Sequence, residues 1–221
     1  MTLQIFGLPI HEFDVAATDV LLCLETGFFA RVLFGHKFAA PVPRRLFTAF
    51  FVFVSLSSLL GAFFHAFFPR KASTPEGFVV WILTALSVGV AASVVWYINV
   101  YLIKGEQVVR AARLATALFM LVYAYVLLFI DYRFMVVILF YLPPVIVLAL
   151  ISLFQAIRTR QPPWPLLLAG VILTFVAAGV QFLHLGIHPH YFNHNALYHL
   201  IQGVALALIF ISFRRLLIER F

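Results

Sequence analysis

The residues best suited to chemistry in this sequence are its histidines, because neutral imidazole is the commonest metal ligand at neutral pH. Five of the eight lie between residues 184 and 199, and His65 ends an apolar stretch much earlier in the chain. Three histidines with one open position form a typical ligand set of a catalytic zinc ion. We therefore predict that His65, His194 and His199 bind Zn2+, with His190 as the alternative to His194.

The spacing of the later histidines decides which imidazoles can share a metal ion. Side chains three or four residues apart lie on one face of a helix, a rule that His190 and His194 satisfy, as do Asn195 and His199. His194 and His199 are five residues apart, which is about 140° around an ideal helix. Both reach one metal only if the helix begins or bulges near His194. The alternative for His188 and His190 is that they are solvated loop residues.

Two carboxylates near these histidines are candidate catalytic bases. We predict that Glu76 or Asp131 accepts a proton from a metal-bound water, whose pKa the metal lowers. Alternatively, Glu76 belongs to a helix-capping box that begins at Ser73. The alternative for Asp131 is a tight turn with an ion pair to Arg133.

Further polar residues lie within or at the end of apolar stretches, where an ionisable side chain is costly unless it faces the protein interior. Asp19 lies about a turn and a half inside the first stretch, which begins at Asp14. His184 ends the sixth stretch one turn after Gln181. A hydrogen-bonded pair is therefore the alternative to metal binding at His184.

Membrane-spanning helices must position these residues. Of 221 residues, 64% are hydrophobic and 10% are charged, whereas a soluble domain carries about a quarter charged residues. About 20 apolar residues cross the hydrocarbon core, and seven stretches suit this length, at residues 14–33, 47–68, 77–103, 114–130, 134–154, 166–184 and 195–213. The short links leave no room for a soluble domain. We therefore predict a single all-α domain over residues 1–221, folded as a seven-transmembrane helix bundle.

The distribution of basic residues predicts the orientation of this bundle. With the N-terminus outside and the C-terminus in the cytosol, twelve of the fifteen Lys and Arg residues fall on the cytosolic side, as the positive-inside rule requires. His65 and the five late histidines then lie near the outer face. The net charge of +7 is scattered between apolar runs, which indicates topology and not a nucleic-acid-binding surface. We predict a multi-pass protein of a bacterial inner membrane or a eukaryotic endomembrane, with membrane lipid as its partner.

The residues around these histidines resemble the CREST superfamily of seven-helix membrane proteins, which includes alkaline ceramidases and progestin/adipoQ receptors. The resemblance rests on Gly61-Ala-Phe-Phe-His65, on Glu76 eleven residues later, and on His194-Asn-Ala-Leu-Tyr-His199. It implies a zinc ion held by three histidines, with a serine and an aspartate nearby that assist amide or ester hydrolysis. The resemblance to the ceramidase branch also implies a calcium site in an acidic N-terminal stretch, for which Asp14 and Asp19 are the candidates here. In this sequence Gly61 stands at the serine position and Glu76 at the aspartate position, and the last histidine pair is spaced by five residues instead of four.

Three functions follow as hypotheses. The leading one is a zinc-dependent intramembrane hydrolase of a lipid amide or ester, with its site near the extracytoplasmic face. The missing serine at position 61 favours an alternative, a seven-helix receptor or sensor with a structural metal site and no hydrolysis. The third is a haem-binding or proton-coupled transport protein in which facing histidines are axial ligands or relay groups.

Overall fold

The computed structural model describes residues 3–5, 7–36, 38–188 and 191–219, and in this part of the chain the protein is all-helical apart from one short hairpin, as the apolar stretches predict. Six of its seven helices, α2 to α7, are long and apolar enough to cross a membrane, which indicates a multi-pass membrane protein. The helices are α1 (Phe13–Gly35), α2 (Pro41–Phe67), α3 (Pro75–Lys104), α4 (Glu106–Phe129), α5 (Phe134–Thr159), α6 (Pro163–Phe182) and α7 (His194–Glu219).

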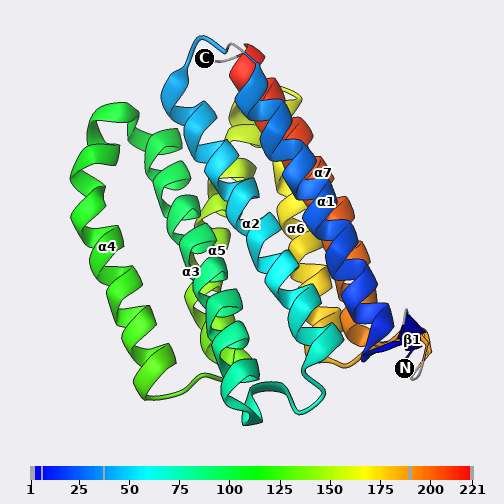
Figure 1. The fold of residues 1–221 in the computed structure, drawn as a ribbon. Helices are drawn as coiled ribbons and strands as arrows, with labels where there is room; N and C mark the ends of the chain where they lie inside the picture. Colours follow the sequence, from blue (N-terminus) through cyan, green and yellow to red (C-terminus); the bar gives the residue numbers. More distant parts are fainter. Residues whose placement is uncertain (1–2, 6, 37, 189–190, 220–221) are drawn as a thin grey trace.

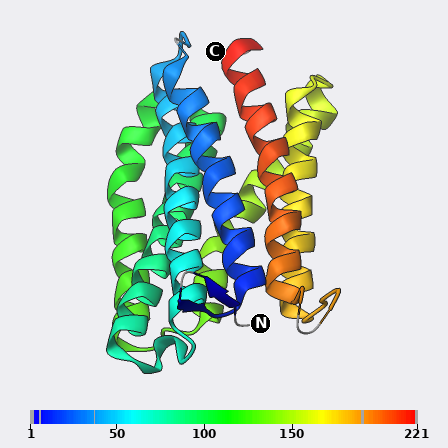
Figure 2. The same ribbon diagram turned by 45° about the vertical axis from the view of Figure 1, so that its right-hand side comes forward.

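Six helices form a ring, and the seventh stands outside it. Around the ring, α1 packs on α2, α2 on α3, α3 on α5, α5 on α6, α6 on α7, and α7 back on α1. Figure 1 shows the helices running alongside one another, with α4 at one edge against α3. Turned by 45°, Figure 2 shows α1 and α7 in front, with the two chain termini at opposite ends of the bundle. Residues far apart in sequence, from α1 and α7, therefore become neighbours.

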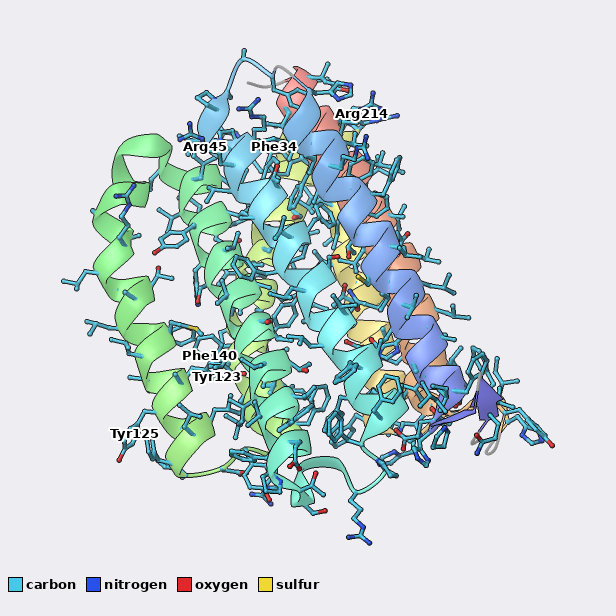
Figure 3. All side chains as sticks on the ribbon, viewed as in Figure 1. Phe34, Arg45, Tyr123, Tyr125, Phe140 and Arg214 are labelled. Atoms are coloured by element: carbon cyan, nitrogen blue, oxygen red, sulfur yellow. The ribbon has the colours of Figure 1, made fainter. Side chains whose placement is uncertain are left out.

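Aromatic side chains fill the inside of the helix ring at the end of the bundle where α2 begins and α7 ends. Phe47 of α2 stacks on Phe213 of α7 with ring centroids 3.9 Å apart, and all of their surface is buried or nearly so. Phe29 of α1 stacks on Phe210 of α7 at 4.2 Å. Arg45 and Arg214 lie at this same end of the bundle (Figure 3). The ring is thus closed by packed aromatic rings at one end, and any internal space lies toward the other.

A short β-hairpin precedes α1, and apolar periodicity did not predict it. Strand β1 (Leu3–Ile5) pairs antiparallel with β2 (Leu8–Ile10), with Leu3 opposite Ile10. The N–H of His11 then donates to the carbonyl of Ala66 at 2.9 Å. This bond attaches the hairpin to the end of α2.

The start of α3 differs from the prediction that Ser73 is its cap. Pro75 occupies the first helical turn, and the hydroxyl of Thr74, the residue before it, accepts the N–H of Gly77 at 3.2 Å. Proline is favoured at the first helical position, so the cap falls on Thr74. Ser73 instead ends a 3-10 helix, η1 (Lys71–Ser73), and donates to the carbonyl of Arg70.

The close approach of α6 and α7 at Gly170 leads to a stability prediction. A Cβ at this position would lie 2.8 Å from Ile209 Cγ1 and 2.9 Å from the carbonyl oxygen of Ala205. Overpacking of this kind typically costs about 1–3 kcal/mol, so we expect Gly170→Ala to unfold at a lower temperature than wild type. Gly179→Ala on the same helix is the control, because no atom lies within 4 Å of its Cβ. Equal melting temperatures for the two variants in detergent would contradict this packing.

Candidate active site

A cavity of about 520 Å³ lies inside the ring and is lined by residues of all six ring helices. Most of its wall is apolar. Sites for small molecules have this size and character, with a few convergent polar groups that fix the orientation of the ligand. The polar groups that matter here are Asp19, His65, Gln181, Asn195, His199 and Gln202.

Asp19 of α1 and His199 of α7 face each other in the cavity wall. Their side chains are buried, and Asp19 Oδ1 lies 3.4 Å from His199 Nε2. On the other side of the imidazole, Nδ1 lies 3.1 Å from Thr18 Oγ1. The Thr18 hydroxyl also lies 3.0 Å from the carbonyl of Asp14 and 2.9 Å from that of Val15. Because its single proton is donated to these helix carbonyls, its oxygen accepts the proton on Nδ1.

This arrangement favours the tautomer of His199 that carries its proton on Nδ1. With the proton on Nδ1, the lone pair of Nε2 points at the Asp19 carboxylate. Asp19 and His199 therefore form a buried carboxyl–imidazole pair, with 3.4 Å between oxygen and nitrogen. A proton between these two atoms would give each of them a partner, and a buried polar group without a partner is costly.

Gly61 of α2 leaves the space that the Asp19 carboxylate occupies. A Cβ at position 61 would lie 3.0 Å from Asp19 Oδ2 and 3.3 Å from its Cγ. Both residues line the cavity. The carboxylate of α1 thus lies against the backbone position where the family resemblance would place a serine.

His65 lines the same cavity one turn after Gly61, although 134 positions separate it from His199. Its Nδ1 lies 2.5 Å from Oε2 of Glu12, the residue that precedes α1. The two predicted metal ligands therefore reach one cavity. Each has an acidic partner of its own, Glu12 for His65 and Asp19 for His199.

His194 lies apart from these two histidines. It is the first residue of α7, and its Nε2 lies 3.0 Å from Nδ1 of His184. Neither of these two imidazoles lines the cavity. Asn195 does line it, together with His199 one turn later, so the pair spaced by four residues is the one that faces inward. His190 lies outside the described residues.

The ligand sets expected for zinc and calcium are not assembled by the part of the chain that the structure describes. Among residues 3–5, 7–36, 38–188 and 191–219, no group of three His, Cys, Asp or Glu side chains could hold a metal ion. Asp14 Oδ2 accepts the N–H of Asn193 at 3.1 Å, while Asp19 faces His199, so these two carboxylates serve different partners.

Neither predicted base lines the cavity. Glu76 lies in the first turn of α3, beside a separate surface depression that Phe67 and Phe68 also line. Asp131 forms the tight turn considered as its alternative, with its Oδ2 2.7 Å from Arg133 Nη2. Hydrogen bonds from the Arg133 guanidinium lower the pKa of the Asp131 carboxyl below its ordinary value. A carboxylate held in this way is a weak general base at neutral pH.

Two amide oxygens in the cavity have no donor within the described part of the chain, and sequence reasoning missed one of these residues. Among the described residues, Gln181 Oε1 and Gln202 Oε1 are buried without a hydrogen-bond partner. The Thr174 hydroxyl donates to the carbonyl of Gly170 at 3.2 Å, so its oxygen accepts Nε2 of Gln202 at 3.3 Å and fixes the orientation of that amide. The spacing in the sequence could have identified Gln202 as a cavity residue, because it lies three residues after His199 and therefore on the same helix face. A ligand with N–H or O–H groups would satisfy both oxygens.

Comparison with known proteins yields one match. The model of a family of unknown function, DUF6962, matches residues 15–218, almost the whole chain. No curated protein and no solved structure matches. Nothing in these comparisons bears on the resemblance to the CREST superfamily, which stays a prediction.

Proposed function

The chain belongs to the family of unknown function DUF6962, and we propose that it is an intramembrane hydrolase of a lipid amide or ester, with Asp19 and His199 as its catalytic pair. The observation that supports this most is the buried carboxyl–imidazole pair, 3.4 Å between oxygen and nitrogen, in the wall of a cavity of about 520 Å³. Pairs of titratable groups that share one proton serve as combined acid and base in hydrolases.

The proposed reaction uses the two sides of Asp19. Oδ2, which packs against Gly61, accepts a proton from a water molecule in the cavity, and the resulting hydroxide forms a bond to the substrate carbonyl carbon. The proton shared with His199 Nε2 passes to the leaving nitrogen or oxygen as the carbon–nitrogen or carbon–oxygen bond breaks. The proton taken from water then replaces it in the pair. Thr18 holds the imidazole in the required tautomer, since it accepts from Nδ1.

The rest of the cavity favours an amide over an ester. Its apolar wall, with Leu22, Val54 and Phe64, suits an acyl chain. Gln181 Oε1 and Gln202 Oε1 are acceptors without donors among the described residues. A buried acceptor left unpaired costs about 1–3 kcal/mol. The binding free energy of a substrate that donates an N–H to either oxygen is therefore more favourable by that amount than the binding free energy of one that cannot.

The test is fatty-acid release by the purified protein from an N-acyl amide, its N-methylated counterpart and the matched ester. We expect the amide with an N–H to be cleaved fastest, about tenfold faster than the N-methyl amide if one such bond is lost. Metal content and the effect of a chelator are measured on the same sample. Stoichiometric zinc together with loss of activity on chelation would replace this mechanism by the three-histidine one.

A receptor or sensor that binds the same lipid without cleaving it is the second candidate. The observation that favours it is Gly61, which removes the serine that the CREST resemblance associates with hydrolysis. The same substrate panel separates the two functions. Saturable binding of the amide with no release of fatty acid would support the receptor.

For the membrane arrangement, we propose seven crossings, with α1 included. Its 23 residues would span about 35 Å as an α-helix, enough for the hydrocarbon core. Its lower hydropathy comes from charged residues, of which Asp14 and Asp19 are buried inside the bundle. The end that carries Arg45 and Arg214 is then cytosolic by the positive-inside rule, and the cavity lies toward the opposite, extracytoplasmic face.

This topology predicts which loops an impermeant thiol reagent can reach. In a Cys23→Ser background, which removes the only cysteine, we expect Ile187→Cys between α6 and α7 to be labelled in intact cells. Gln161→Cys between α5 and α6 should be labelled only after the membrane is opened. Both positions are exposed in the structure, so access to the side chain is matched. Labelling of Gln161→Cys alone in intact cells would reverse the orientation.

A further inference from the structure

Two imidazoles meet outside the cavity, between the end of α6 and the start of α7. His184 Nδ1 lies 3.0 Å from His194 Nε2, and the two rings are perpendicular, at 90°. His184 is exposed and His194 is half-buried. The alternative partner that the sequence suggested for the His184 ring, the Gln181 side chain, is replaced by a backbone bond, His184 N–H to the Gln181 carbonyl at 3.3 Å.

The backbone holds both rings in place. His184 has a φ of 53°, in the left-handed region that residues other than glycine seldom adopt. Asn193 caps α7, since its Oδ1 accepts the N–H of Asn195 at 2.9 Å, and this fixes the first residue, His194. Between the two helices, His188 and Phe192 exchange backbone hydrogen bonds of 3.0 Å. Two helix ends and a bonded loop therefore determine the distance between the imidazoles.

From this geometry we infer that His184 and His194 form a surface binding site for a divalent transition metal of the Cu2+ or Ni2+ type. With metal–nitrogen bonds of about 2.0–2.1 Å, a nitrogen–nitrogen distance of 3.0 Å corresponds to an angle of about 95° at the metal. That angle suits the square-planar or tetragonal geometry of Cu2+ and Ni2+ better than the tetrahedral geometry of Zn2+.

Metal binding at this site requires only a change of tautomer. Each neutral imidazole carries its one proton on the nitrogen that faces away from the metal, which is His184 Nε2 and His194 Nδ1. Within the described residues no third His, Cys, Asp or Glu side chain completes a set of three. This site is separate from the cavity, and its occupancy does not depend on hydrolysis.

The test is Cu2+ titration of the full-length protein, purified without a histidine tag, followed by calorimetry and electron paramagnetic resonance. We expect one equivalent with two nitrogen ligands. His184→Asn and His194→Asn should each weaken binding about tenfold or more, the scale seen when metal coordination is impaired. Asn tolerates the left-handed conformation, and an unchanged melting temperature checks that the His184→Asn variant is folded.

The matched control is His36→Asn. His36 is an exposed histidine at the other end of the bundle, and its Nδ1 lies 3.0 Å from the carbonyl oxygen of Val32. The His36→Asn variant should bind Cu2+ with the same affinity as the wild type. The inference is overturned if His184→Asn and His194→Asn both retain the wild-type affinity for Cu2+, or if the spectrum of the wild type shows no pair of nitrogen ligands.

Discussion

Asp19→Asn and His199→Gln should each reduce lipid hydrolysis by about 10²–10⁴-fold, the usual contribution of a general acid or base. Asp19→Asn keeps the shape of the side chain but removes the oxygen that accepts a proton from water. His199→Gln keeps a polar group of similar reach but removes the partner that shares the proton. Because the apolar wall of the cavity is unchanged, both variants should still bind the lipid. Initial rates of fatty-acid release, beside binding of a labelled substrate analogue, separate these effects.

Glu76→Gln is the matched control for this prediction. Glu76 lies beside a surface depression and does not line the cavity, so the variant should retain near-wild-type turnover. A large loss of rate in Glu76→Gln, with little change in Asp19→Asn, would restore Glu76 as the catalytic base that the CREST resemblance favours.

Much of the fold could be predicted because helix length in a membrane is set by bilayer thickness. Each predicted apolar stretch corresponds to a helix, but several helices extend beyond the predicted stretch. For example, α2 begins at Pro41, before Arg44 and Arg45, and α7 runs to Glu219. Backbone hydrogen bonds do not stop where apolar side chains do, so hydropathy alone places these ends too far inward. The hairpin before α1 was missed because its strands have only three residues each.

The candidate site could be predicted only in part, because the sequence did not show which residues of α7 face the cavity. His65 and His199 line one cavity, and the sequence suggested that they lie close together because each ends or begins an apolar helix on the same side of the bundle. The sequence favoured His194 over Asn195 because histidine is the better metal ligand. The residue that faces the cavity is instead Asn195, because it lies four residues before His199 and therefore on the same helix face. Since α7 begins at His194, that residue points toward His184.

The role of Asp19 depends on a contact that periodicity cannot show. Asp19 and Thr18 reach His199 because α1 and α7 close the ring of helices, and nothing within either segment specifies that neighbour. Its carboxylate also needs the space at Gly61, on a third helix. The resemblance to ceramidases suggested Asp14 and Asp19 as a calcium site, while the structure gives each carboxylate a partner on or next to α7.

Gly61→Ser should lower turnover by about 10²-fold, because small displacements of a catalytic group have effects of this size. The new Cβ would lie 3.0 Å from Asp19 Oδ2, closer than an ordinary contact, so the carboxylate must shift away from the attacking water. Gly61→Ala, which adds the Cβ without the hydroxyl, should show a similar loss. Gly179→Ser on α6 is the control, since its Cβ would meet no atom within 4 Å.

The same substitution separates the proposed pair from the chemistry that the CREST resemblance implies. In that chemistry a serine at position 61 assists hydrolysis beside a zinc ion, so Gly61→Ser would maintain or raise the rate. In the chemistry proposed from Asp19 and His199, the serine displaces the Asp19 carboxylate and lowers the rate of hydrolysis. Rates are compared at equal folded fraction, judged from melting temperature, and with added zinc or chelator. A Gly61→Ser variant that is more active with zinc than wild type would show that Asp19 and His199 are not the catalytic pair.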